Sequence, residues 1–467
     1  MGPLGGYDMR ILVVGAGKVG ATLAEHLVQE QHDVTVIDSD EDVLEDCQDM
    51  MDIMCINGNG ANAQTLIDAG VDKVDVLIAA TAGDEVNMLC CLIGKRLGAR
   101  YAIARIRDPQ YNESLTLLQQ ELGIDMVINP ERATALEISH LLRFPFASNI
   151  ESFAKGRVEM VEFRAQPGDS VVGVPLSVLT GRHSHLPRVL YAAVERDGQV
   201  TIPSGDFIIR PGDRVFVTGD TVTVTSFFDA LGKNKLRVKN VMILGGGRIS
   251  YYLAKMIVPT GIHVTMVEIN PTKAEKLSEE LPHVTVLCGD GTNMELLEQE
   301  GVMSTDALVC LTDRDEENLM TGLFAAHQKV PKVIVKNNHL NYTDIISEMG
   351  LDSMVSPKQI TSANILRYVR ARARTQGTRV EKLYRVLNGK AEALEFDVRA
   401  GEKWLGIPLK NLVMRKNTLV AVIVRRGKVI VPFGNDTIEA GDSVVFMACE
   451  SGIHDINQII QGTNIHA

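Results

Sequence analysis

Two glycine-rich segments of the 467-residue chain have the residue types and spacing of phosphate-binding loops. The first, GAGKVG at residues 15–20, follows an apolar run and opens a helical pattern. In such a loop the first glycine permits a tight turn, the second lets backbone approach a pyrophosphate, and the third permits close helix–strand packing. The free N–H groups at the helix N-terminus can then face the phosphates. The sequence therefore predicts a nucleotide-binding site at this loop.

Other polar residues follow the strands expected next to this loop. Asp38 ends the second strand, where a carboxylate accepts hydrogen bonds from ribose hydroxyls and repels a 2′-phosphate. We therefore expect NAD(H) or an adenine nucleotide, such as ATP or ADP, rather than NADP. Ligands of open parallel sheets bind at the carboxyl ends of the strands. The candidate contacts of this first site are Gly15, Ala16, Gly17, Lys18, Val19, Asp38, Asn59, Gly60, Thr81, Ala82 and Arg105.

The same constellation recurs about 230 residues later, so the chain is a tandem repeat. A second loop, GGGRIS at residues 245–250, has serine at the third glycine position. Asp313 follows Thr312 where the first repeat has Ala82, and this anion is expected to make the two sites unequal. Nucleotide binding and a purely structural second copy both remain open. The candidate contacts of the second site are Gly245, Gly246, Gly247, Arg248, Ile249, Glu268, Thr312 and Lys336.

The elements that position these residues alternate between short β-branched runs and helical patterns. In the first repeat we expect strands at 11–14, 34–37, 53–56, 74–80, 102–106 and 126–128, with helices that include 19–29, 85–97 and 132–142. Strand–helix alternation predicts a parallel sheet covered on both faces, and six strands fit the doubly wound order. The fold class is thus α/β, with two tandem Rossmann-like nucleotide-binding domains.

A different pattern follows each of these domains. Short alternating runs at 158–163, 189–195 and 214–217 are separated by Pro-Gly-Asp and Asp-Gly turns and followed by a helical stretch at 222–231. This indicates a small β-rich α+β module, repeated in the second half. We place the domain limits at 9–132, 149–233, 238–358 and 379–463, and interpret residues 1–8 as a cloning remnant.

Composition excludes several classes of function. Lys and Arg number 47 and Asp and Glu 59, which gives a net charge of −12 and disfavours nucleic acid as a partner. No apolar run approaches the roughly 18 residues of a membrane span. Neither metal-ligand spacing nor a convincing set of catalytic acids and bases is present. A nucleotide-binding fold without a recognisable set of catalytic residues suggests a sensor rather than an enzyme. An NAD-dependent oxidoreductase is the alternative.

These motifs resemble the TrkA family of Trk potassium uptake regulatory proteins, which are built from regulator-of-conductance-of-potassium (RCK) domains. The similar segments include ILVVGAGKVG (11–20), LIAATAGDEVNM (77–88), IARIRDP (103–109), LTDRDEENLM (311–320) and PGDRVFVTG (211–219). The resemblance extends over about residues 9–462. It identifies the domains as RCK N-terminal and the β-rich modules as RCK C-terminal.

The resemblance implies a cytosolic regulatory subunit, peripheral on the inner face of the plasma membrane, that binds NAD(H) and ATP or ADP. It would gate a TrkH-like membrane potassium transporter subunit; a nucleotide-sensing regulator of another transporter remains an alternative. The resemblance also implies a homo-oligomer, a tetrameric ring. Two linking segments, 134–146 and 360–374, motivate this assembly because they carry apolar residues that would otherwise be left to solvent. A basic stretch begins within the second segment and is either solvated or faces an acidic or membrane-bound partner. It consists of Arg367, Arg370, Arg372, Arg374 and Arg379.

Overall fold

A computed structural model describes residues 9–111, 114–154, 157–181, 185–233, 238–338, 351, 353–372, 380–386, 391–449, 453 and 455–463. The presumed cloning remnant at 1–8 lies outside these residues, as do Arg374 and Arg379 of the basic stretch.

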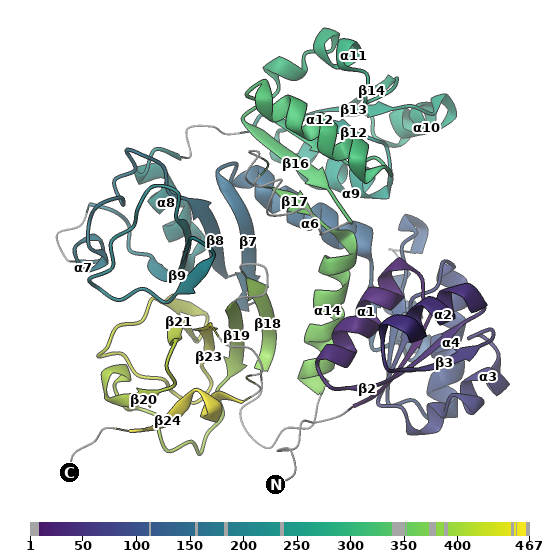
Figure 1. Ribbon diagram of the computed structural model, residues 1–467, viewed down its shortest axis with the longest axis horizontal. Coiled ribbons are helices and arrows are strands. Elements are labelled where there is room, and N and C mark those ends of the chain that lie inside the picture. Colours follow the sequence, from purple (N-terminus) through teal and green to yellow (C-terminus); the bar gives the residue numbers. More distant parts are fainter. Residues whose placement is uncertain are drawn as a thin grey trace. The chain divides into compact units, whose positions relative to one another are not determined.

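The first repeat opens with a six-stranded sheet in the predicted doubly wound order, β3-β2-β1-β4-β5-β6, and its paired strands are parallel. Figure 1 labels β2 and β3 of this sheet. The six expected strands are confirmed to within a few residues. They are β1 (Arg10–Val14), β2 (Asp33–Asp38), β3 (Met54–Asn57), β4 (Val76–Ala79), β5 (Tyr101–Arg105) and β6 (Met126–Ile128). The covering helices are α1 (Lys18–Gln29), α2 (Glu41–Met50), α3 (Ala63–Asp68), α4 (Asp84–Leu97) and α5 (Leu115–Leu122).

Two separate apolar cores hold these helices on the two faces of the sheet. Buried residues of α1 and α2, such as Leu23 and Leu44, pack with alternate strand residues into one core. Buried residues of α3 and α4, such as Leu66 and Met88, pack into the other. Strands that are covered on both faces consist of continuous apolar runs, and for this reason their positions can be predicted from the sequence.

The second repeat has the same topology, with strand order β14-β13-β12-β15-β16-β17. Its strands are β12 (Asn240–Leu244), β13 (His263–Glu268), β14 (Val284–Cys288), β15 (Ala307–Cys310), β16 (Lys332–Lys336) and β17 (Met354–Val355). Its helices are α9 (Arg248–Ile257), α10 (Pro271–Glu280), α11 (Met294–Gln299) and α12 (Asp315–His327). The α/β class and the tandem Rossmann-like architecture are therefore confirmed.

Each β-rich module contains a five-stranded sheet with antiparallel pairing. The first has order β10-β9-β11-β8-β7, from β7 (Ala147–Phe153), β8 (Val158–Arg164), β9 (Leu190–Arg196), β10 (Gln199–Thr201) and β11 (Arg214–Asp220). Helix α8 (Thr221–Ala230) follows it, close to the expected position, and α6 (Pro130–Arg143) precedes it.

The second module has order β18-β19-β23-β21-β22. Its strands are β18 (Val380–Val386), β19 (Ala391–Asp397), β21 (Thr418–Arg425), β22 (Lys428–Ile430) and β23 (Ser443–Ala448). After β23, the described residues form a short 3-10 turn, Ile456–Gln458, and strand β24 (Ile460–Thr463). Strand β24 pairs antiparallel with β20 (Leu412–Met414), a pairing for which the first module has no equivalent among its described strands.

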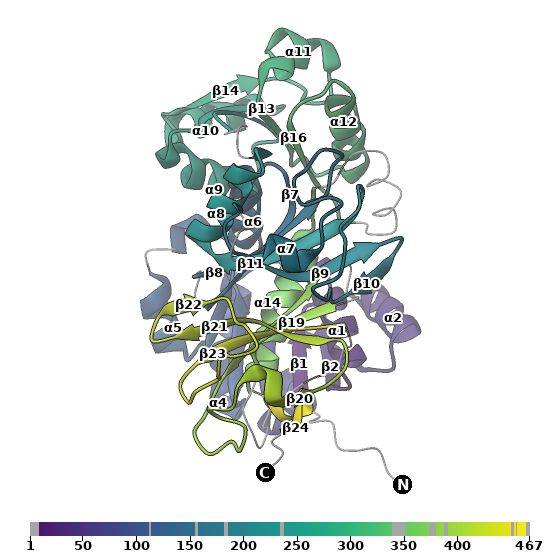
Figure 2. The ribbon, with the colours of Figure 1, turned by 90° about the vertical axis from the view of Figure 1, so that its left-hand side faces the viewer.

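The two modules share one apolar core. Phe153, Met160 and Phe216 of the first module are buried in the same cluster as Val422 and Met447 of the second. Figure 2 shows the strands of the two modules next to each other. The backbone N–H of Ala154 donates to the buried Glu395 carboxylate at 3.1 and 3.2 Å, which adds a polar contact to this core.

Helix α14 (Pro357–Arg372) follows the second sheet in sequence but packs on α1 of the first (Figure 1). Ile365, Leu366 and Val369 lie in the core that also holds Leu23. The reason given above for assembly is therefore wrong for this segment, because its apolar residues are covered within the chain.

The same packing changes the interpretation of the basic stretch. Arg370 forms a two-pronged ion pair with Glu30 at the end of α1. Arg372 lies over the rings of Tyr101 and Tyr368, 4.8 and 5.0 Å from their centroids. These two cations already have partners within the chain, so they are not free for an acidic partner.

Candidate functional site

The first glycine loop has the backbone geometry that its sequence predicts. Gly15 has a φ of +100°, and a Cβ there would lie 2.8 Å from the Thr81 backbone nitrogen. A Cβ at Gly20 would lie 1.8 Å from the Gly15 carbonyl oxygen. Gly17 precedes the first turn of α1, and a Cβ there would meet nothing within 4 Å. The loop therefore requires glycine at positions 15 and 20. At Gly17 the space beside the backbone is open.

Asp38 lies at the edge of this loop and also forms a hydrogen bond with its backbone. Its Oδ2 accepts the Ala16 N–H at 2.5 Å, and its Oδ1 accepts the Asp40 N–H at 3.1 Å. A carboxylate can accept about four hydrogen bonds, so acceptor capacity remains for ribose hydroxyls. The predicted ribose acceptor is thus also a structural part of the glycine loop.

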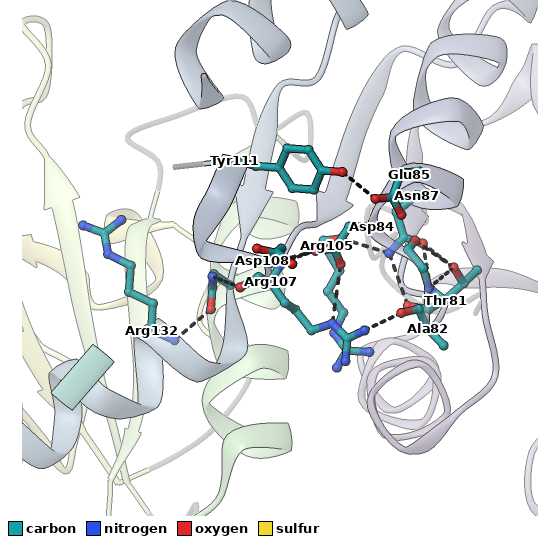
Figure 3. A network of polar contacts seen from close by, with 12 residues as sticks. Thr81, Ala82, Asp84, Glu85, Asn87, Arg105, Arg107, Asp108, Tyr111 and Arg132 are labelled. Atoms are coloured by element: carbon teal, nitrogen blue, oxygen red, sulfur yellow. Dashed lines mark hydrogen bonds and ion pairs between the residues drawn. The ribbon is translucent and has the colours of Figure 1, made fainter. Parts of the chain in front are cut away.

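Thr81 lies at the carboxyl end of the sheet, but its hydroxyl has a structural partner (Figure 3). The hydroxyl and the backbone N–H both donate to Asn87 Oδ1, at 2.7 and 2.8 Å. The Asn87 amide donates to the carbonyls of Thr81 and Arg105, at 3.2 and 2.9 Å. Buried Asn87 therefore joins the ends of β4 and β5, and the second repeat has the same arrangement around Asn318.

Arg107 is a candidate phosphate ligand that the sequence analysis missed. Its side chain reaches across to the carbonyl of Ala82, and its Nε lies 3.5 Å from Asp84 Oδ1 (Figure 3). Asp84 is buried and also accepts the backbone N–H groups of Arg107 and Asp108 at 2.8 Å. The available signal was a second arginine two residues after Arg105, which ends β5.

The remaining first-site candidates lie on the same edge of the sheet. Asn59 is exposed, and its side chain accepts the N–H of Ala61 at 2.9 Å, which shapes the loop after β3. Gly60 is required because a Cβ there would lie 2.1 Å from Val14 Cγ1. Lys18 is exposed on the first turn of α1, where Val19 follows it.

In the second repeat the equivalent edge is hollowed into a cavity of about 260 Å³. The cavity is bounded by the glycine loop and by the carboxyl ends of β13 and β15. Its lining residues are Gly245, Gly246, Gly247, Val267, Glu268, Ile269, Lys273, Asp290, Gly291, Thr292, Leu311, Thr312, Asp313, Arg314 and Glu317. Of the predicted second-site residues, the three glycines, Glu268 and Thr312 line it.

Three predicted second-site residues do not line this cavity. Arg248 is exposed on the first turn of α9, and Ile249 is buried. Lys336 is buried at the end of β16, with its Nζ 3.5 Å from the exposed Asp313 carboxylate. Asp313 is therefore offset by a cation of its own, while Arg314 pairs with Glu317.

Glu268 is buried and held from three sides. Gly246 N–H and Lys273 Nζ both lie 2.9 Å from its Oε2, and the Asn270 N–H donates to Oε1 at 2.9 Å. Burial raises the pKa of this carboxyl, but these hydrogen bonds and the Lys273 charge outweigh burial and lower the pKa below its usual value. Glu268 is thus a carboxylate near neutral pH.

Serine at the third glycine position fits the second loop. The Ser250 hydroxyl donates to the Gly245 carbonyl, the group that a Cβ at Gly20 would strike in the first repeat. The second loop therefore accommodates a small polar side chain at this position.

The described residues supply binding groups: backbone N–H donors, carboxylate acceptors and cations around a glycine loop. Within the described ranges, no group of three or more His, Cys, Asp or Glu could hold a metal ion. In the same part of the chain no helix is long and apolar enough to span a bilayer.

The fold and the two loops define a class: two Rossmann-type nucleotide-binding domains, each followed by a β-rich module. Two family models match in this order, the TrkA-N domain at residues 11–130 and 241–357 and the TrkA-C domain at 160–232 and 393–461. The chain belongs to the TrkA family of Trk system potassium uptake proteins.

Relatives match along almost the whole chain. The Trk system potassium uptake protein TrkA homolog of Archaeoglobus fulgidus is 33% identical over 97% of this chain and 100% of its own length. The TrkA protein of Vibrio alginolyticus is 33% identical over 97% of this chain and 99% of its own length.

Solved structures show the same fold. The GsuK RCK domain has a TM-score of 0.62 at 16% identity and covers 94% of this chain and 92% of that one. The GsuK channel bound to NAD also has a TM-score of 0.62 at 16% identity, over 94% of this chain and 77% of that one.

Proposed function

We propose that this chain is the regulatory subunit of a potassium uptake system and gates a TrkH-like membrane potassium transporter subunit in response to nucleotides. Its membership of the TrkA family along the full length carries this proposal. The proposed location is cytoplasmic, peripheral on the inner face of the plasma membrane. A tetrameric ring is the proposed assembly, and the domain limits given above remain a prediction.

The proposed ligands are NAD(H), ATP or ADP, bound at the carboxyl edge of each sheet. In the first repeat the backbone of residues 15–19 would receive the phosphates, Asp38 the ribose, and Arg105 and Arg107 would neutralise phosphate charge. Residues 59, 60, 81 and 82 would shape the rest of the site. In the second repeat residues 245–249, Glu268, Thr312 and Lys336 would take the corresponding places.

Gating requires that a nucleotide bind one conformation of the assembly more tightly than another. A switch from 1:99 to 99:1 needs about 5.5 kcal/mol of differential binding. Several coupled sites in one assembly can supply this sum, whereas a single site would need a 10⁴-fold difference in affinity. The duplication of the nucleotide-binding domain fits this requirement.

Potassium flux into proteoliposomes tests the proposal. The transporter subunit is reconstituted with and without this chain, and NADH, NAD, ATP or ADP is added to the chain's side. We expect flux to depend on both the chain and a nucleotide. Nucleotide-independent flux would contradict the proposal, and turnover of NADH with a small-molecule substrate would favour the oxidoreductase alternative.

A further inference from the structure

The acidic ribose positions of the two repeats have nearly the same surroundings. Asp38 accepts the N–H of the second loop residue, Ala16, and the N–H two positions further along its own chain. Glu268 accepts the corresponding N–H groups of Gly246 and Asn270. The backbone therefore holds both carboxylates in one way, so a difference between them must come from side chains.

One side chain makes that difference. Lys273 lies on the first turn of α10, lines the second cavity and places its Nζ 2.9 Å from Glu268 Oε2. Its counterpart in the first repeat, at an offset of 230, is the apolar Val43, which packs against the core. In the described part of the chain Asp38 has no ion-pair partner.

We infer that Lys273 makes the second site accept a nucleotide phosphorylated on its adenosine ribose, such as NADP(H), which Asp38 excludes from the first site. This inference rests on the proposed nucleotide binding. An unpaired carboxylate repels a 2′-phosphate, whereas a cation beside the ribose position attracts it. Lys273 neutralises Glu268 in the free protein and can turn to the phosphate when the ligand binds.

The exposure of Lys273 permits this exchange of partners. Its side chain is 48% exposed, whereas that of Glu268 is 6% exposed. The lysine can therefore shift toward a ligand while the carboxylate keeps its two backbone donors. Glu268 would retain the structure of the glycine loop, and Lys273 would set the ligand preference.

Binding to the full-length chain tests the inference. NADH and NADPH are titrated separately by calorimetry, which gives affinities and the number of sites per chain. We expect NADH to bind two sites per chain and NADPH only one. Lys273→Gln should weaken NADPH at least tenfold and leave NADH within threefold, and Lys273→Arg should retain NADPH binding. Lys276→Gln, on the same helix but paired with Glu280, is the matched control.

The reciprocal change is Val43→Lys, which should create a second NADPH site. The inference is overturned if wild-type chain binds NADPH at neither site or at both, or if Lys273→Gln weakens NADH and NADPH equally. Absence of NADH from both sites would instead overturn the proposed nucleotide binding itself. One NADH site with no NADPH site would leave the first site standing and refute the inference.

Discussion

Asp38 has one observed role and one proposed role. It accepts the Ala16 N–H of the glycine loop, and in the proposed site it would also accept a ribose hydroxyl. We expect Asp38→Ala to weaken NADH binding by about 1–3 kcal/mol, since a hydrogen bond to a charged group contributes roughly 1.5–3 kcal/mol. Calorimetry on the full chain measures this. Asp40→Ala is the control because Asp40 supplies only a backbone N–H to Asp38; equal affinities in wild type and Asp38→Ala would contradict the ribose assignment.

Asp313 adds a negative charge to the lining of the second-repeat cavity. It is exposed and lies 3.5 Å from Lys336 Nζ, whereas the first repeat has the neutral Ala82. Asp313→Ala removes an anion and releases Lys336, so we expect at least tenfold tighter ATP or NADH binding at the second site. The first site should be unaffected. Titration of the full chain would contradict this if the weaker site remains as weak as in wild type.

The contrast between the glycine-loop edges of the two repeats extends beyond Asp313. Five charged lining residues fall at neutral positions of the first repeat: Lys273, Asp290, Asp313, Arg314 and Glu317 correspond to Val43, Asn59, Ala82, Gly83 and Val86. The sequence reveals these substitutions once the repeat is aligned. It does not reveal which charges cancel, because Lys336–Asp313 and Lys273–Glu268 are paired only in three dimensions.

At the scale of elements, Asn87 and Asn318 each join two strand ends. Each asparagine is buried and bonds both the threonine after one strand and the last carbonyl of the next. We expect Asn87→Ala and Asn318→Ala each to lower the free energy of unfolding by about 1–3 kcal/mol, because buried polar groups lose their partners. Chemical denaturation measures this. Asn59→Ala, at an exposed loop position, should cost less, and equal costs would contradict the structural role of Asn87.

An ion pair between buried Asp213 and half-buried Arg196 stabilises the turn before β11. Asp213 accepts Arg196 Nε and Nη2 at 2.8 and 2.7 Å and the Arg210 N–H at 2.8 Å. Burial raises the pKa of Asp213, but Arg196 and the Arg210 N–H outweigh burial and lower it. A lowered pKa stabilises the fold above the ordinary value near 3.9, and that contribution is lost as the pH falls through the folded-state pKa.

Asp213→Asn should therefore be less stable than wild type at pH 7 by at least about 1.5 kcal/mol. Its stability should also fall less steeply below about pH 4, because the titrating group is gone. Urea unfolding at a series of pH values measures both effects. Stability curves that run parallel down to pH 2 would show that Asp213 does not contribute to the acid sensitivity.

Most element positions were predictable because a doubly covered parallel sheet produces long apolar strands and regular helices. For this reason the strands of the first sheet lie within a few residues of their predicted positions. Two features could not be predicted from the sequence. Arg107 is an ordinary basic residue until the turn after β5 places it beside Ala82. The partners of α14 lie far away in sequence, and Glu30, which pairs with Arg370, is 340 residues away. Long-range pairing leaves no local pattern, so periodicity cannot reveal it.

At the scale of the whole molecule, the two repeats are interdependent. Helix α14 belongs to the second repeat in sequence but to the same compact unit as the first 136 residues. Ile365, Leu366 and Val369 are buried there, and each buried side chain of this kind contributes about 1.5–3 kcal/mol. The first repeat therefore depends on a helix that a cut between the repeats would remove.

We expect a fragment ending at residue 236 to unfold at lower denaturant concentration than the same domain in the full chain. Val369→Asp in the full chain tests the same contact without truncation, because it places a charge in the core beside α1. Ala363→Asp, at an exposed position of α14, is the matched control. Arg370→Ala should have an intermediate effect, since it removes the Arg370–Glu30 ion pair but leaves the apolar contact. If the fragment and Val369→Asp both retain the stability of the full chain, α14 does not hold the first domain together, and the repeats are independent units after all.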